Sequence, residues 1–136
     1  MTAFEDRVRT LAYQSDLRVR EVSGYRARLT FVFDTDGRRT EQTCFITSFK
    51  DGAYWEFDCV SAIKEDMVFS ELAMYVLKEN SKHFRGFWCL EKLGSATALT
   101  YMHNIASALL TPDEFSKTCW DVTTRVDDLE RNLLRR

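Results

Sequence analysis

The chain contains few of the residues that break helices and strands and mark linkers between domains. It has one proline and five glycines in 136 residues. It also has no low-complexity tract and no internal repeat at the periods typical of solenoids. A length of this size falls within the usual range of one domain, and no stretch has the composition of a linker. We therefore expect a single domain over residues 1–136.

Charge of one sign and long apolar runs are also missing. The 19 Lys and Arg residues are balanced by 21 Asp and Glu residues, and the net charge of −2 provides no basic surface for nucleic acid. The N-terminal residues are acidic where a signal peptide is basic, and no apolar run approaches the roughly 18 residues of a membrane span. We therefore expect a cytoplasmic protein with no nucleic-acid partner and no membrane partner.

Signatures of catalysis and metal binding are absent as well. The four cysteines lie far apart without a CxxC pair, and His83 and His103 have no Cys or carboxylate at ligand spacing. Neither a phosphate-binding glycine loop nor a serine nucleophile motif occurs. Glu56 and Asp58 could act as paired carboxylates in acid and base chemistry, but we expect them to be solvated and structural. The sequence predicts no catalytic residue, no cofactor and no metal.

The Asp51-Gly52 dipeptide predicts a two-residue hairpin turn, which fixes the register of the strands on either side. In that register Ile46 faces Phe57 and Cys44 faces Cys59. A disulfide between these cysteines is within geometric reach. We favour two reduced thiols that serve as small buried hydrophobic groups, as expected in a reducing cytosol.

Hydrophobic periodicity predicts the order of the elements. We expect a helix over 3–14, followed by three strands: the first over 25–33, the second from the turn at 34–37 to about residue 49, and the third over 53–63. A second helix follows the cap at 64–66. Two further strands, over 83–93 and 96–105, precede the final helix. The fold class is α+β, in the order α-β-β-β-α-β-β-α. It comprises a five-stranded antiparallel sheet with the helices mainly on one face.

The residues from Ser107 onward contain the clearest helix signal. Thr111 as N-cap, Pro112 at the first helical position and Glu114 in a capping box mark its start. Apolar residues then recur at spacings of four and three along a narrow stripe that docks on the rest of the chain: Phe115, Cys119, Val122, Val126, Leu129 and Leu133. We expect the charged residues between them to be solvated: Asp121, Arg125, Asp127, Asp128, Glu130 and Arg131.

The predicted fourth strand carries large apolar residues on both sides. Phe84, Trp88 and Leu90 would lie on one face, and Phe87 and Cys89 on the other. Strands that are apolar on both faces are usually buried on both faces. Since the helices cover only one face, the other must be covered by a second subunit, by a bound peptide, or by an outlying helix or terminus of the same chain.

Aromatic residues make up 13% of the chain, and rigid aromatic side chains anchor many protein interfaces. Most of them belong in the core. We expect four to be available to a partner: Trp88, Phe87, Tyr54 and Trp120. A homodimer, or a complex with another protein or peptide, is the expected use of these residues.

Several segments resemble the YbjN-type family, which is described as candidate bacterial sensory transduction regulators and shares the fold of type III secretion chaperones. They are Phe69-Ser70-Glu71-Leu72, Val76-Leu77-Lys78-Glu79-Asn80, Phe84-Arg85-Gly86-Phe87-Trp88, Leu110-Thr111-Pro112-Asp113-Glu114-Phe115 and Val126-Asp127-Asp128-Leu129-Glu130. The N-terminal half agrees in element order only, and Lys92-Leu93-Gly94-Ser95 replaces an acidic turn. The resemblance implies a bacterial cytoplasmic protein, a compact α+β fold, frequent homodimers and no catalytic residues.

Two functional hypotheses follow. The first is a non-enzymatic interaction module, chaperone-like or regulatory, that binds a partner polypeptide on an exposed aromatic sheet face or by adding a strand to the sheet edge. The alternative is a small-molecule-binding or enzymatic domain that uses a cleft between sheet and helices. We favour the first, because the strands do not supply the convergent polar cluster that the second requires.

Overall fold

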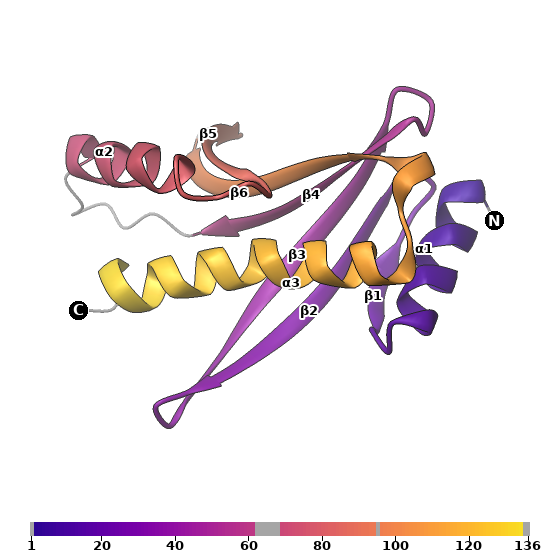
Figure 1. Cartoon of the computed structure of the whole chain (residues 1–136), viewed down its shortest axis with the longest axis horizontal. Helices are drawn as coiled ribbons and strands as arrows, with labels where there is room; N and C mark the ends of the chain where they lie inside the picture. Colours follow the sequence, from indigo (N-terminus) through magenta and orange to yellow (C-terminus); the bar gives the residue numbers. More distant parts are fainter. Residues whose placement is uncertain (1, 62–68, 95, 135–136) are drawn as a thin grey trace.

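The computed structural model describes residues 2–61, 69–94 and 96–134 and has the α+β class that the sequence predicts (Figure 1). Its elements are α1 Ala3–Gln14, β1 Val19–Val22, β2 Arg26–Thr35, β3 Arg38–Phe49, β4 Tyr54–Ser61, α2 Phe69–Asn80, β5 Phe87–Leu93, β6 Ala96–Ala106 and α3 Pro112–Leu129. A short 3₁₀ turn, Ser107–Leu109, precedes α3, and one π-helical turn, Glu130–Leu134, extends it. The first helix has the bounds expected from its periodicity.

The strands form one antiparallel sheet of six strands in the order β1-β2-β3-β4-β6-β5, rather than the five that we expected. The additional strand is β1. Its pairing with β2 shifts register between Val19 and Glu21. Such a shift breaks the alternation of apolar and polar residues, so the pattern from which strands are recognised is missing there.

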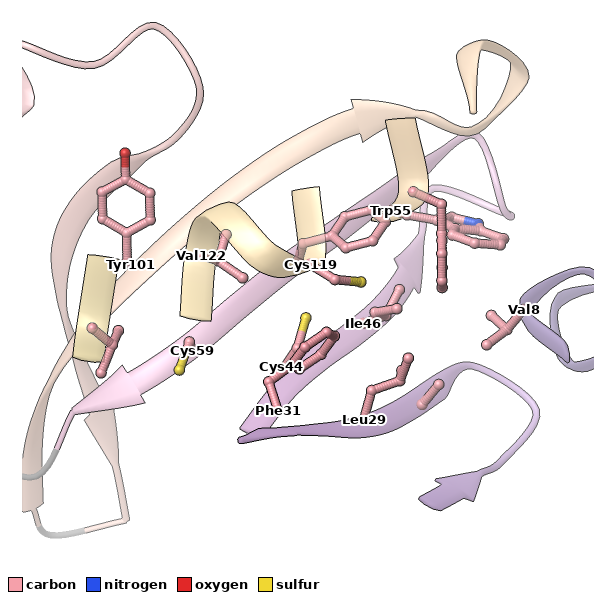
Figure 2. Packing of buried hydrophobic residues seen from close by; sticks show 14 of the residues in the cluster. Val8, Leu29, Phe31, Cys44, Ile46, Trp55, Cys59, Tyr101, Cys119 and Val122 are labelled. Atoms are coloured by element: carbon pink, nitrogen blue, oxygen red, sulfur yellow. The ribbon is translucent and has the colours of Figure 1, made fainter. Parts of the chain in front are cut away.

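All three helices lie on the same face of the sheet, as predicted. Figure 1 shows α3 crossing the strands with α1 beside one end of it. One buried apolar cluster joins Phe4 of α1, Val76 of α2 and Phe115 of α3 to the inward residues of the strands. Figure 2 shows part of this cluster, with Val8 of α1 and Val122 of α3. We call the opposite face the open face. Residues 64–66, the expected cap of α2, lie outside the described residues. Among the described residues, no helix combines the length and apolar character needed to cross a membrane.

The start of α3 follows the predicted signal in part. Thr111 Oγ1 accepts a hydrogen bond from the Glu114 N–H at 3.1 Å, and Pro112 is the first helical residue. The Glu114 carboxylate binds Arg85 instead of completing a capping box. The apolar stripe is buried from Phe115 to Leu129, whereas the side chain of Leu133 lies outside the described residues.

One residue of the expected charged outer face of α3 is in fact buried. Asp127 is only 1% exposed, because the helix lies against the sheet at this point. Its carboxylate accepts hydrogen bonds from Thr40 Oγ1 at 2.7 Å and Gln42 Nε2 at 3.2 Å, both on β3, and from Arg131 at 3.0 Å. These bonds lower the pKa of Asp127 despite its burial. The helix is therefore fastened to β3 by polar contacts as well as by its apolar stripe.

The hairpin between β3 and β4 has the predicted turn and register. Asp51 and Gly52 both have positive φ, the Ala53 N–H donates to the Lys50 carbonyl at 3.1 Å, and Ile46 lies opposite Phe57. Cys44 and Cys59 are buried free thiols, as is Cys119, which lies next to Cys44 (Figure 2). Burial raises the pKa of both Cys44 and Cys59, so the two groups stay in the thiol form.

The strand expected over 83–93 begins only at Phe87, because the chain turns at Gly86. This glycine has a φ of +91°, and a Cβ there would lie 2.6 Å from the Tyr101 ring and 2.7 Å from the Met102 carbonyl oxygen. The Tyr101 hydroxyl donates a hydrogen bond to the Arg85 carbonyl at 2.9 Å. Phe84 consequently lies outside the strand and is fully exposed, so its predicted place on a strand face is wrong.

Gly86→Ala should destabilise the protein by about 3 kcal/mol or more, since it combines an unfavourable φ with a steric clash against β6. Gly37→Ala is the matched control, because Gly37 also has positive φ (+75°) but no atom lies within 4 Å of the new Cβ. It should cost only about 1 kcal/mol. Urea unfolding measures both; equal losses would contradict the close approach at Gly86.

Candidate functional site

The sheet has a free edge where β6 extends beyond β5. The last β5 pair is Phe87 opposite Met102, yet β6 continues to Ala106, which pairs with Tyr54 of β4 on its other side. The Ser107 N–H donates to the Ala53 carbonyl at 2.9 Å. Every second residue counted back from Ser107, such as Ile105 and His103, therefore turns its backbone groups toward β4. The backbone N–H and C=O groups of Asn104 and Ala106 therefore point away from β4, to the side where β5 has ended.

A pocket of about 440 Å³ lies along this free edge. Phe84 and Leu109 lie on its border and are strongly exposed, and Ile105 is half-buried within it. We call the pocket and the adjoining strand edge the edge groove: Phe84, Arg85, His103–Ala106, Leu109 and Glu114. It combines exposed apolar side chains with the backbone groups of an unpaired strand.

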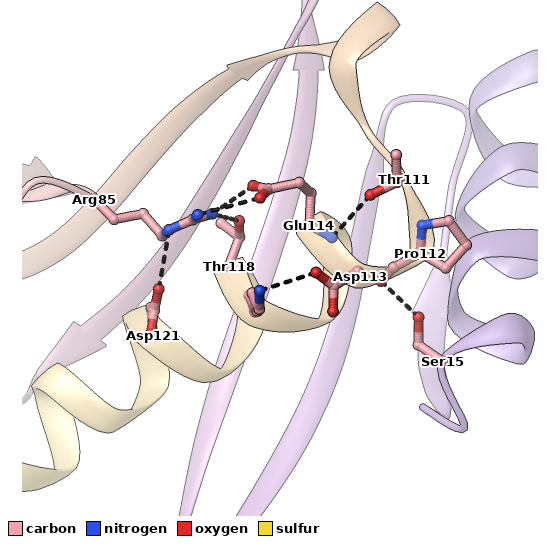
Figure 3. A network of polar contacts seen from close by, with 9 residues as sticks. Ser15, Arg85, Thr111, Pro112, Asp113, Glu114, Thr118 and Asp121 are labelled. Carbon is pink, nitrogen blue, oxygen red and sulfur yellow. Dashed lines mark hydrogen bonds and ion pairs between the residues drawn. The ribbon is translucent and has the colours of Figure 1, made fainter.

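Arg85 fixes the wall of the edge groove to α3 (Figure 3). Its guanidinium donates to both carboxylate oxygens of Glu114, at 3.2 Å for the longer contact, and its Nε lies 3.4 Å from Asp121. These hydrogen bonds lower the pKa of Glu114. Burial, and then the charge of Arg85, lower the pKa of His103, so its ring is neutral at pH 7. The groove wall is thus held in place with its charges paired.

Two other edges of the described sheet are less accessible. At β5, the Asn80 side chain accepts a hydrogen bond from the Trp88 N–H and donates one to the Trp88 carbonyl at 3.1 Å. It occupies the outward backbone groups of that residue as a neighbouring strand would. At the opposite edge, β1 has four residues and carries a register shift. Short, irregular or covered edges discourage strand pairing, so β1 and the Trp88 position of β5 are poorly suited to it. Residues 30–35 of β2 extend beyond β1, but among the described residues that stretch has no pocket of the kind that adjoins β6.

An acidic patch lies on the open face, comprising Glu56 and Asp58 of β4 and Glu91 of β5. The expectation that nothing buries the first two carboxylates is wrong for Asp58, which is 6% exposed. It lies on a central strand between Phe45 and Met102, which are opposite it on the two neighbouring strands. Burial, followed by the charges of Glu56 and Glu91, raises the pKa of Asp58 to about 7.

A basic site lies on the same face at β2. The guanidinium of Arg26 lies 4.4 Å from the centre of the Phe45 ring, and Arg28 donates to Glu21 at 2.8 Å. Arg28 Nε is buried without a hydrogen-bond partner among the described residues. Both arginines line a pocket of about 200 Å³, together with Phe45 and Glu21. We call it the arginine pocket.

Trp88 is not available to a partner in this structure, contrary to our expectation. It is 6% exposed, and its ring meets that of Tyr101 edge-on at 5.1 Å. Its side chain points to the helix-covered face, since Trp88 lies opposite Tyr101, which is fully buried. The residue therefore belongs to the core of the single chain.

The three other predicted interface residues are exposed but do not form one surface. Phe87 (41% exposed) and Tyr54 (46%) lie on the open face, where Tyr54 stacks with Phe49. Trp120 is also exposed, but on the helix-covered side, with its ring against Phe31 and Phe33. The open face thus keeps two of the four predicted residues, and the edge groove contains none of them.

Convergence of His103 with Glu56 or Asp58 in one cleft would support the enzymatic alternative. His103 lies opposite the buried Phe57, on the helix-covered side, whereas the two carboxylates lie on the open face. In the part of the chain that the structure describes, no group of three or more His, Cys, Asp or Glu residues could hold a metal ion. The ionisable groups are therefore divided between the two sides of the sheet.

Comparison with known proteins identifies the fold. No family model matches the chain, and no curated protein matches its sequence. The crystal structure of YbjN, a candidate transcription regulator from E. coli, aligns with a TM-score of 0.68 over 93% of this chain and 90% of that one, at 11% sequence identity. The chain thus has the YbjN fold, which is that of type III secretion chaperones, and the resemblance seen in the sequence is confirmed for the fold.

Asp58→Asn should stabilise the monomer at pH 8 by roughly 2 to 4 kcal/mol and change little at pH 4. The folded-state pKa of about 7 lies above the unfolded value of 3.8, so the native state holds the proton more tightly. The protonated Asp58 carboxyl stabilises the folded state at low pH, and this contribution is lost as pH rises from about 4 to about 7. Urea unfolding at low protein concentration measures the difference; an equal effect at both pH values would contradict it.

Trp88→Glu should unfold the chain, or cost at least about 3 kcal/mol, because it places a charge in the core. Phe87→Glu, one position along the strand, should leave the monomer within about 1 kcal/mol of wild type, since its side chain is on the open face. Near-UV circular dichroism and urea unfolding separate the two outcomes. Native spectra for both variants would show that Trp88 is not a core residue.

Proposed function

We propose that this chain, which has the YbjN fold, is a non-enzymatic interaction module that binds an extended segment of a partner polypeptide as an added strand on β6. The observation that carries the proposal is the free edge beyond Phe87, where Asn104 and Ala106 present unpaired backbone groups. Main-chain hydrogen bonds at such an edge supply affinity, and the adjoining pockets supply selectivity.

The two sides of the edge would receive different residues of the added strand. Side chains on the helix-covered side would enter the edge groove between Phe84 and Leu109, which favours large apolar residues. Those on the open side would lie beside Asn104, which is exposed and polar. A partner segment with alternating apolar and polar residues fits both sides.

The length of the free edge limits the strength of binding. Four β6 residues, His103–Ala106, lack a partner strand on this side. Two of them, Asn104 and Ala106, offer up to four backbone hydrogen bonds of about 1 kcal/mol each, so affinity must come largely from the groove. A reversible complex fits a chaperone-like or regulatory role, which we place in the cytoplasm.

Selection from a random peptide display library should yield peptides that protect the Asn104 and Ala106 amides. Both N–H groups would donate to the added strand, so their hydrogen exchange should slow and their ¹⁵N chemical shifts should change on binding. Phe84→Asp should weaken binding by about tenfold or more by removing an apolar wall. NMR titration and calorimetry measure these effects.

Met74→Asp is the matched control, because Met74 is an exposed apolar residue on α2 outside the edge groove. It should leave peptide affinity unchanged. Failure to select any binding peptide would refute the proposal, as would selected peptides that bind equally well to Phe84→Asp and leave both amides unprotected.

A further inference from the structure

A pocket of about 160 Å³ lies between α2 and the C-terminal half of α3, on the helix-covered side of the sheet (Figure 1). Its described lining residues are all different from those of the edge groove. The two helices bring opposite charges to its walls, so the convergent polar cluster that the strands lack is present here. We call it the helix pocket, and its lining includes Tyr75, Glu79, His83, Arg125, Asp128 and Leu129.

We infer that the helix pocket binds a free α-amino acid, whose carboxylate lies against Arg125 and whose ammonium group lies between Asp128 and Glu79. The site and its ligand differ from those of the edge groove, so this inference stands independently of the proposed strand addition. It gives a module without catalytic residues a second, chemically different binding site.

Arg125 supplies a cation without a counter-ion. Asp128 lies one turn further along α3, a spacing at which arginine and aspartate can pair. Its Oδ1 atom instead binds Arg131 at 2.7 Å. Among the described residues, Arg125 forms no ion pair with a carboxylate. Because a half-buried charge is costly unless it is paired, an incoming carboxylate at Arg125 is favoured.

The guanidinium of Arg125 is already held at the pocket wall. Its Nε is enclosed, so the terminal amino groups are the ones that can reach a ligand. Behind it lies the buried Tyr101: burial raises the pKa of this tyrosine, and a hydrogen bond from Arg125 opposes the rise. The Tyr101 hydroxyl itself donates to the Arg85 carbonyl at 2.9 Å. Such anchoring reduces the conformational entropy that binding would cost.

Two carboxylates supply the negative side of the helix pocket. Asp128 is 44% exposed and uses only Oδ1 in its ion pair with Arg131, so Oδ2 is available to an ammonium group. Glu79 lies on the α2 wall, where a hydrogen bond from Lys82 lowers its pKa and keeps it ionised at neutral pH. A ligand between the helices therefore meets negative charge from both of them.

Tyr75 shows that the two carboxylates converge on one place. Burial, followed by the charge of Glu79 and then that of Asp128, raises the pKa of its hydroxyl, although Lys82 opposes the rise. The Tyr75 hydroxyl thus lies near both groups, one from its own helix and one from α3. It can also exchange hydrogen bonds with a polar ligand.

Size and charge together favour an amino acid over other ligands. The pocket is smaller than the roughly 300 Å³ at which sites for drug-sized molecules begin, which excludes nucleotides and peptides. A simple anion at Arg125 would lie beside Asp128 and Glu79, and a simple cation would lie beside Arg125. A zwitterion pairs both charges. Trp88 and Leu129 add apolar atoms to the lining, which favours an aliphatic side chain.

Titration with each proteinogenic L-amino acid, followed by saturation-transfer difference NMR and calorimetry, tests the inference. At least one should bind with a dissociation constant of about 1 mM or lower. Its N-acetyl derivative, which lacks the ammonium group, and its α-amide, which lacks the carboxylate, should each bind about tenfold or more weakly. No binding by any amino acid at about 10 mM, or equal binding of both derivatives, overturns the inference.

Two variants identify the contacts. Arg125→Gln should weaken binding about tenfold or more and should bind the amino acid and its α-amide equally, because the group that distinguishes them is gone. Asp128→Asn should weaken binding about tenfold while it keeps the preference over the α-amide. Lys117→Gln, which removes an exposed charge on α3 outside the pocket, is the matched control and should leave the affinity unchanged.

Circular dichroism of each variant checks that the chain is folded. Folded Arg125→Gln and Asp128→Asn proteins that bind as tightly as wild type would overturn the inference, even if an amino acid binds to the wild type. Loss of amino-acid binding would not affect peptide protection of Asn104 and Ala106, so the two proposals can fail separately.

Discussion

All three helices pack on one face of the sheet, and this one-sided cover determines the character of the other face. The apolar side chains of the strands alternate toward the helices, where they form a single core with α1, α2 and α3. The side chains on the open face have none of the described helices packed on them, so they contact one another or solvent. Asp58 is buried there between its cross-strand neighbours Phe45 and Met102, and burial is the main cause of its raised pKa.

The close approach at Gly86 links this layer arrangement to the edge groove. The chain reaches β5 through a conformation that only glycine adopts easily, and it passes within contact distance of Tyr101 and Met102. Arg85 then reaches across to Glu114 and Asp121 of α3. The position of α3 on the sheet therefore sets the position of Arg85 in the groove wall. Because β5 begins only at Phe87, the last residues of β6 have no described partner strand on that side.

Features encoded by neighbouring residues could be predicted from the sequence. The bounds of α1, the cap at Thr111, and the β3–β4 register set by Asp51 and Gly52 depend on local signals, and the structure confirms them. The exposed aromatic residues Phe87 and Tyr54 were also identified.

Features set by contacts distant in sequence could not be predicted. β1 lacks a regular pattern, and Asp127 is buried because α3 meets β3. The edge groove depends on where β5 ends relative to β6. Gly86 within an apparent strand was the one signal of it. By bonding both outward backbone groups of Trp88, Asn80 takes the place of a further strand beside β5, so aggregation by strand addition is blocked at that point.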